Sequence, residues 1–337
     1  MFKKIFLLNI IIFLLLILLL ELSARLFHFA DLTGVSKNLL IFKGERHENA
    51  PNIEATVFSK RAYTDKFGFR IPYKNYIYEN LNSSVLILGD SVSFGVGVEE
   101  EKTFVGLLRK EFKNINFYNS SVSGYHLKNY PNILKKNLNL ENLGEVILFY
   151  TLNDISFENR VLNFQDQLDE DFDTDEINFF NKLRKNKYLA RVNFFLRNKS
   201  VFYMWVKGVI TRPSERHFYY TFPIYKNDSA IDDLKFEINK LKNITEKNNL
   251  ELFIIILPYE FQTRSENCKS YYLQPQTKVK NILLSSKIKF KDYTNIFCNY
   301  EKTDSLFLKY DPVHLSSKGH ELVFSLLKND VNYLSKY

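Results

Sequence analysis

The sequence is poor in several residue types that define particular protein classes. Of 337 residues, only 2 are cysteines, 11 are glycines and 8 are prolines. Two cysteines without a CxxC or HxxxH pattern nearby provide no metal site, so we expect neither a metal nor a cofactor. Scarce glycine and proline, together with 21 tyrosines and 31 phenylalanines, argue against a disordered chain.

The excess of positive charge lacks the pattern of a nucleic-acid-binding protein. The formal net charge is +8, but the lysines are interleaved with aspartate and glutamate along the chain. The sequence contains no basic arm, zinc finger or RNA-binding signature. We therefore expect a solvated basic surface and no nucleic-acid partner.

The two cysteines, Cys268 and Cys298, leave two interpretations open. In an oxidising compartment, a disulfide between them would close a loop of ~30 residues and contribute about 3 kcal/mol. Alternatively, they are two separate buried thiols. The sequence does not decide, because it does not give the distance between the two Cα atoms.

One long apolar run is present, at the N-terminus. Lys3 and Lys4 precede an uncharged run from Ile5 to Leu20 that only Asn9 interrupts. As a helix this run spans about 24 Å, slightly less than the ~30 Å of a bilayer's hydrocarbon core. A cleaved signal peptide needs small residues before its cleavage site, and Leu22-Ser23-Ala24 fits that requirement poorly.

We therefore favour an uncleaved membrane anchor over residues 1–25, with secretion after signal cleavage as the alternative. In both cases the two lysines lie on the cytoplasmic side and the rest of the chain lies outside. This predicts a single-pass protein of the inner (cytoplasmic) membrane whose main domain is in the periplasm or outside the cell.

Strands alternate with helices from about residue 81 to the C-terminus. The predicted strands are Ser84–Gly89, Ile115–Ser120, Glu145–Tyr150, Leu250–Pro258 and Lys287–Tyr293. The predicted helices are Thr103–Phe112, Leu127–Leu138, Ala230–Asn248 and a last one from about Ser316. Such alternation predicts a three-layer α/β/α fold around a mostly parallel, five-stranded sheet.

Two segments fall outside this alternation. Residues 26–80 are expected to form a stem that leads into the domain of residues 81–337. Residues 155–228 interrupt that domain, and we expect this insertion to govern substrate choice. Its acidic run, Asp166–Glu176, is expected to be a solvated loop. For its aromatic residues we favour core packing over a substrate wall or contact with the bilayer surface. These residues are Phe194, Phe195, Tyr203 and Trp205.

Reactive and polar groups follow the predicted strands. Gly89-Asp90-Ser91 follows the first strand, Gly124 the second and Thr151-Leu152-Asn153-Asp154 the third, while Asp311 and His314 come after the fifth. Because ligands bind beyond the carboxyl ends of parallel strands, we expect these groups to meet in one crevice.

Together these residues supply the groups of a serine acyl hydrolase. A serine hydroxyl needs a base such as histidine, and the histidine needs a carboxylate at its other ring nitrogen. Asp311 and His314 are three residues apart, which puts them on one face of a helical turn. The amides of Ser91 and Gly124 and the side chain of Asn153 are candidate donors to an oxyanion.

Each of these signals taken alone has a structural interpretation, as a turn or a helix cap. Their joint occurrence, in order and at the expected strand ends, favours the catalytic interpretation. Other histidines are not assigned a role in catalysis. We expect His126 to be a surface or packing residue and His320 to be structural.

Four sequence blocks resemble those of the SGNH hydrolases, or GDSL esterase/lipase superfamily. They are ILGDSVSFGVGV, NSSVSGY, TLND and DPVHLSSKGH. The resemblance implies a flavodoxin-like SGNH fold, with Ser91 as nucleophile and oxyanion donor, His314 as base and Asp311 as its orienting acid. It also implies that Gly124 and Asn153 complete the oxyanion hole. Thr151 departs from the family's Gly-x-Asn-Asp, and the missing second glycine of Gly-x-Ser-x-Gly argues against an α/β-hydrolase.

The single anchor followed by this domain is similar to bacterial relatives that add or remove acyl groups on cell-envelope glycans. This implies a serine ester hydrolase that acts on acyl or acetyl esters, with a glycan or an acylated small molecule as substrate. Two alternatives stay open: an O-acyltransferase acting on an extracytoplasmic polysaccharide, and a non-catalytic glycan-binding protein. The sequence does not indicate the acyl group, the alcohol or the oligomeric state.

Overall fold

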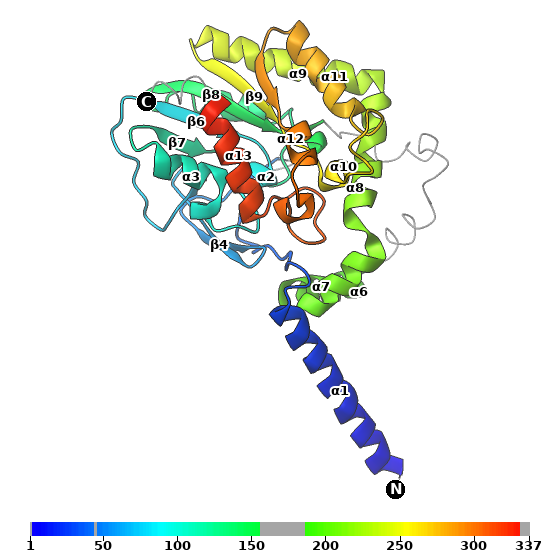
Figure 1. Cartoon of the computed structure of the whole chain (residues 1–337). Helices are drawn as coiled ribbons and strands as arrows, with labels where there is room; N and C mark the ends of the chain where they lie inside the picture. Colours follow the sequence, from blue (N-terminus) through cyan, green and yellow to red (C-terminus); the bar gives the residue numbers. More distant parts are fainter. Residues whose placement is uncertain (1, 44–45, 156–185, 331–337) are drawn as a thin grey trace.

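An eight-stranded sheet runs through the computed structural model, which describes residues 2–43, 46–155 and 186–330 (Figure 1). The strand order is β10-β9-β8-β6-β7-β5-β4-β3, and the first five of these pair in parallel. They are β6 (Ser84–Leu88), β7 (Asn116–Asn119), β8 (Leu143–Tyr150), β9 (Glu251–Ile256) and β10 (Lys289–Asp292). All five overlap the strands predicted from the sequence, so the mostly parallel α/β architecture is confirmed.

Three further strands correct the expected strand number from five to eight. They are β3 (Glu54–Val57), β4 (Lys60–Thr64) and β5 (Arg70–Ile71), and they pair antiparallel. A separate hairpin of β1 (Leu40–Lys43) and β2 (Arg46–Asn49) precedes them. All five come from the segment expected to be a stem. With two to five residues each, they are too short to show a clear apolar alternation.

Helices cover both faces of the sheet. On one side, α3 (Phe104–Glu111) packs against α13 (Ser317–Asp330) (Figure 1). On the other side, α4 (Tyr130–Lys136) and α11 (Gln274–Ser285) pack against α9 (Asp228–Lys247). The buried positions of α9 include Leu234, Ile238 and Leu241, whose spacing of four and three residues forms one apolar stripe. These layers agree with the predicted three-layer fold.

The core is centred on the parallel strands. Every residue of β6 is buried, as are the last six residues of β8. Strands covered on both faces need apolar side chains in both directions, which explains the continuous apolar runs in the sequence. The carboxyl ends of these parallel strands lie at one edge of the sheet. The predicted functional residues follow these strand ends.

The N-terminal helix α1 (Phe2–Leu26) projects away from the sheet (Figure 1). Over Lys3–Leu26 it is long and apolar enough to cross a membrane, a test that a signal sequence also passes. Its last turns contact the insertion, since Glu21 accepts hydrogen bonds from the backbone of Val201 (3.0 Å) and Phe202 (3.1 Å).

In its described part, residues 186–228, the insertion contains three α-helices. They are α6 (Lys187–Lys199), α7 (Val201–Thr211) and α8 (Pro213–Thr221). Tyr203 and Trp205 pack against a small cluster that includes Ala24 of α1, whereas Phe194 and Phe195 are 44% and 62% exposed. The prediction of core packing therefore holds for Tyr203 and Trp205 but not for Phe194 and Phe195. The predicted acidic loop Asp166–Glu176 lies outside the described residues.

Cys268 and Cys298 form a disulfide, with their Cα atoms 6.1 Å apart. The bond joins the chain after α10 (Glu260–Thr263) to the end of α12 (Thr294–Cys298). Of the two interpretations that the sequence left open, the structure has the disulfide.

Candidate active site

Ser91 begins a short helix directly beyond the end of β6. In this helix, α2 (Ser91–Phe94), the Asp90 carboxylate accepts the backbone N–H of Val92 at 2.8 Å and so caps the first turn. Gly95 ends the helix in the left-handed conformation, at φ 80°. This tight strand–turn–helix unit presents the Ser91 hydroxyl at the edge of the sheet.

A chain of hydrogen bonds links Ser91 to His314 and Asp311. The Ser91 Oγ lies 2.9 Å from His314 Nε2, and His314 Nδ1 lies 2.8 Å from Asp311 Oδ2. Asp311 Oδ1 also accepts the backbone N–H groups of Val313 (3.0 Å) and His314 (2.8 Å). The carboxylate is therefore held on the far side of the imidazole from the serine.

The charge of Asp311 governs the titration of His314. Burial lowers the pKa of His314, but attraction and hydrogen bonding to Asp311 outweigh it, so that this pKa lies above its usual value. Burial also raises the pKa of Asp311, yet the His314 charge and the backbone hydrogen bonds hold it below its usual value. The pair therefore stabilises an imidazolium next to a carboxylate.

Asn153 is tied to the Ser91 turn from the end of β8. Its Nδ2 donates to the Asp90 carboxylate at 2.8 Å. Its Oδ1 accepts hydrogen bonds from the hydroxyls of Thr151 (2.8 Å) and Tyr259 (3.1 Å). Since an amide group carries two hydrogens, one remains for another acceptor. These bonds fix the side-chain amide beside the residue that precedes Ser91.

Gly124 is connected to the same strand end more indirectly. The N–H of Val122, two residues earlier, donates to the carbonyl of Gly89 at 3.2 Å. Gly124 has φ 83°, and a Cβ added there would lie 3.5 Å from His47 Nε2. The positive φ favours glycine at this position. The structure thus links Ser91, His314 and Asp311 directly, Asn153 through Asp90, and Gly124 through the nearby backbone of Val122.

Sequence reasoning missed three residues that contact this constellation. Thr151 orients Asn153, and Tyr259 reaches the same amide oxygen from the end of β9. Phe58 places its ring centroid 5.2 Å from that of His314, at 73° between the ring planes. The position of Tyr259 immediately after a predicted strand was a usable signal. Phe58 gave none, because its segment was interpreted as a stem.

Phe58 occupies an unusual backbone conformation. With Ser59 it forms the two-residue turn between β3 and β4, and both have positive φ, 49° and 67°. Such turns favour glycine or asparagine, and a bulky residue there is rare. The backbone is therefore in an energetically unfavourable conformation at the residue whose aromatic ring contacts His314.

Two further histidines are kept neutral by burial. His320 accepts the backbone N–H of Phe104 at 3.2 Å, and burial lowers its pKa to about 3, in keeping with the expected structural role. Burial likewise lowers the pKa of His217 to about 4; its ring lies 5.1 Å from that of Tyr259. Among the described residues, no group of three or more His, Cys, Asp or Glu side chains is arranged to hold a metal.

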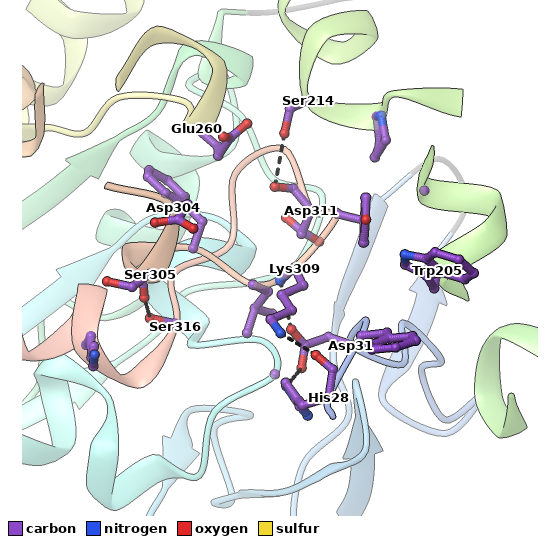
Figure 2. A pocket seen from close by; sticks show the side chains of 18 of the residues that line it. His28, Asp31, Trp205, Ser214, Glu260, Asp304, Ser305, Lys309, Asp311 and Ser316 are labelled. Carbon is purple, nitrogen blue, oxygen red and sulfur yellow. Dashed lines mark hydrogen bonds and ion pairs between the residues drawn. The ribbon is translucent and has the colours of Figure 1, made fainter. Parts of the chain in front are cut away.

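A cavity of about 1060 Å³ lies beside Asp311, with neither Ser91 nor His314 in its lining (Figure 2). Its walls come from the segment that follows α1, from α7 and α8, and from the loop that carries Asp311. Ser214 of α8 donates to the Asp311 carbonyl at 3.3 Å, and Asp31 accepts the N–H of Lys309 at 2.8 Å. The loop that carries Asp311 is therefore held by hydrogen bonds to α8 and to the segment that follows α1.

No family model and no curated protein matches the chain. Among solved structures, it is similar to a lipase/acylhydrolase from Enterococcus faecalis, with 13% identity over 74% of this chain and 95% of that one, and a TM-score of 0.43. It is also similar to an acetylxylan esterase from Geobacillus stearothermophilus (13% identity, 76% and 97% covered, TM-score 0.42). A third is a lipolytic protein of the G-D-S-L family from Desulfitobacterium hafniense (10% identity, 74% and 99% covered, TM-score 0.42).

Proposed function

We propose that the chain is a serine ester hydrolase of the SGNH type. The observation that carries this proposal is the continuous hydrogen-bonded series from Ser91 through His314 to Asp311. The series joins residues 223 positions apart at the carboxyl ends of the sheet, where ligands bind in parallel α/β folds. A helix cap or a turn does not account for the long-range contact between Ser91 and His314.

In the first step, neutral His314 takes the proton of Ser91 while the serine oxygen attacks the ester carbonyl. The imidazolium that forms is stabilised by the charge of Asp311. The carbonyl oxygen becomes an oxyanion that accepts hydrogen bonds from the amides of Ser91 and Gly124 and from Asn153 Nδ2. The tetrahedral intermediate is thus neutralised by groups from three strand ends.

In the second step, the bond to the alcohol breaks and His314 returns its proton to the leaving oxygen. This leaves an acyl group on Ser91. Water, deprotonated by His314, then attacks the acyl carbonyl, and the acid leaves as Ser91 regains its proton. If a sugar hydroxyl enters in place of water, the same steps give an O-acyltransferase.

We propose acyl or acetyl esters of cell-envelope glycans as substrates. The apolar helix α1 supports attachment to the membrane, and the disulfide Cys268–Cys298 is typical of an oxidising compartment outside the cytoplasm. The contacts of Glu21 with α7 support retention of α1 as an anchor, because cleavage after residue 25 would remove them. These features favour a substrate at the outer surface of the membrane.

The test compares the wild-type chain with Ser91→Ala, using Ser325→Ala on the exposed face of α13 as control. We expect the wild type and the control to hydrolyse p-nitrophenyl acetate and to bind a fluorophosphonate covalently. Ser91→Ala should do neither.

Absence of both activities in the wild type would overturn the enzyme proposal and favour a glycan-binding protein. Mass spectrometry of an acetylated glycan incubated with the enzyme separates hydrolysis from transfer to a second glycan.

A further inference from the structure

One face of α6 exposes a continuous row of apolar side chains. Tyr188 is 79% exposed, Val192 54% and Phe195 62%. Their spacing of four and three residues puts them on one side of the helix, with Leu189 (45% exposed) at the border of the row. We call these four residues the α6 stripe. On a helix surrounded by water, such a row is unfavourable.

The opposite face of α6 is bound to the rest of the chain. Arg197 donates from Nε to the Thr33 hydroxyl at 3.2 Å, and the N–H of Thr33 donates to the Arg197 carbonyl at 3.1 Å. Asn193 Oδ1 accepts hydrogen bonds from Tyr203 (2.8 Å) and Lys207 (2.8 Å) of α7. Because these contacts fix the rotation of the helix, the α6 stripe points away from the domain.

The end of α1 fixes the height of this helix relative to a membrane. Glu21 is the first charged residue after the apolar run, so it marks the border of the hydrocarbon layer. Its carboxylate accepts the Ser200 hydroxyl at 2.7 Å, at the junction between α6 and α7. Arg25 also donates to the carbonyl of Lys199. The two helices therefore lie beside the end of α1, at the level where it leaves the bilayer (Figure 1).

We propose that α6 lies in the interface of the same membrane that α1 spans, with the α6 stripe among the upper acyl chains. Arg191, four residues before Phe195, and Lys199, four residues after it, border the α6 stripe. With Lys187 they supply positive charge at its edges, which suits anionic headgroups. The inference rests on retention of α1, as proposed above. It makes the insertion a second membrane contact, which restricts how the domain can tilt on its single anchor.

The experiment uses tryptophan fluorescence in the full-length chain. Trp205 is the only tryptophan, so the Trp205→Phe variant has no tryptophan fluorescence. Phe195→Trp then reports on the α6 stripe. Phe236→Trp is the matched control, because Phe236 is equally exposed (65%) and lies on α9, at the far end of the domain from α1 (Figure 1).

Both variants are reconstituted in phosphatidylcholine/phosphatidylglycerol vesicles that carry bromine near the headgroup end of the acyl chains. We expect the brominated lipid to quench the tryptophan at position 195 at least twofold and to leave that at position 236 unchanged. Aqueous iodide should quench in the opposite order. Fluorophosphonate labelling of Ser91 in each variant verifies that the domain is folded.

Three outcomes would overturn the inference. Equal iodide quenching at both positions would place the α6 stripe in water. Protection of position 195 from both quenchers would mean that another part of the chain covers it. Protection that depends on protein density in the vesicles would indicate a second copy. Loss of the protein from the vesicles on carbonate washing would instead contradict the anchor itself.

Discussion

At the scale of single residues, His314 is subject to two opposing influences. Asp311 raises its pKa through charge and hydrogen bonds, whereas burial, to which the ring of Phe58 contributes, lowers it. If His314 acts as the base, only its neutral form is active, so the acid limb of the pH–rate profile reports this pKa. Replacement of Asp311 and replacement of Phe58 should therefore shift this pKa in opposite directions.

Replacement Asp311→Asn should move the acid limb of kcat/KM to lower pH. Without the Asp311 charge, burial outweighs the weaker attraction of Asp90, so the pKa of His314 falls and its neutral form persists at lower pH. The plateau rate should nevertheless drop by about 10⁴-fold, because the imidazolium and its tautomer lose their support. The measurement is kcat/KM for p-nitrophenyl acetate from about pH 5 to about pH 9. An acid limb that stays in place or moves upward would contradict the assignment of Asp311.

Replacement Phe58→Ala should move the same limb to higher pH, by roughly one unit. Removal of the ring admits water to His314 and weakens the desolvation that lowers its pKa. Phe58→Tyr keeps the ring and serves as the control, with an unchanged profile. A purely structural role for Phe58 would lower the melting temperature of the alanine variant without moving its acid limb.

The sequence indicated the chemical groups of the candidate site but not the residues that hold them in place. Ser91, Asn153, Asp311 and His314 stand out because their side chains are reactive or polar and follow predicted strands. Thr151 was noted at its strand end and as a departure from a family pattern but was given no role, although its hydroxyl binds Asn153. The contact between Phe58 and His314 joins residues 256 positions apart, counted from their numbers, and no local pattern predicts it.

At the scale of elements, the apolar runs made the centre of the sheet predictable. The strands β6, β8 and β9 each contain four or five consecutive apolar residues, and the sequence indicated each of them. The strands β3 to β5 have two to five residues and no such apolar run, and only β3 alternates regularly between exposed and buried residues. Their place in the sheet depends on pairing with β7, a tertiary contact that the segment alone does not encode.

The disulfide between Cys268 and Cys298 should stabilise the elements after β9. It closes a loop with a sequence separation of 30 residues. On a chain-entropy estimate, the double replacement Cys268→Ser/Cys298→Ser should lower the free energy of unfolding by about 3 kcal/mol and the melting temperature by roughly 6–12 °C. Calorimetry measures the shift. Dithiothreitol should reproduce it in the wild type and have no effect on the double variant, and an effect there would contradict the prediction.

At the scale of the whole molecule, the N-terminal helix α1 packs against the domain. Glu21 and Ala24 of α1 are in contact with α7, and Ala24 is fully buried. We therefore expect the mature protein to keep its N-terminus and to remain in membranes after carbonate washing. N-terminal peptide mass spectrometry on the membrane fraction measures this directly.

The control for a released form is Leu22→Ala, which provides small residues at both positions before a signal-peptidase site. This variant should appear partly in the soluble fraction. Release of the wild-type chain to the same extent would show that α1 is a signal peptide.

The hydrogen bonds of Glu21 can form only late in synthesis of the chain. Glu21 and the Ser200 hydroxyl that it accepts are separated by 179 residues. At a synthesis rate of ~5–20 residues per second, the ribosome needs roughly 10–35 s to produce the partner after the anchor has emerged. During that interval the carboxylate has only Arg25, one turn away, as its counter-ion. If α1 is the proposed membrane anchor, it therefore enters the membrane before α7 is available to form these contacts.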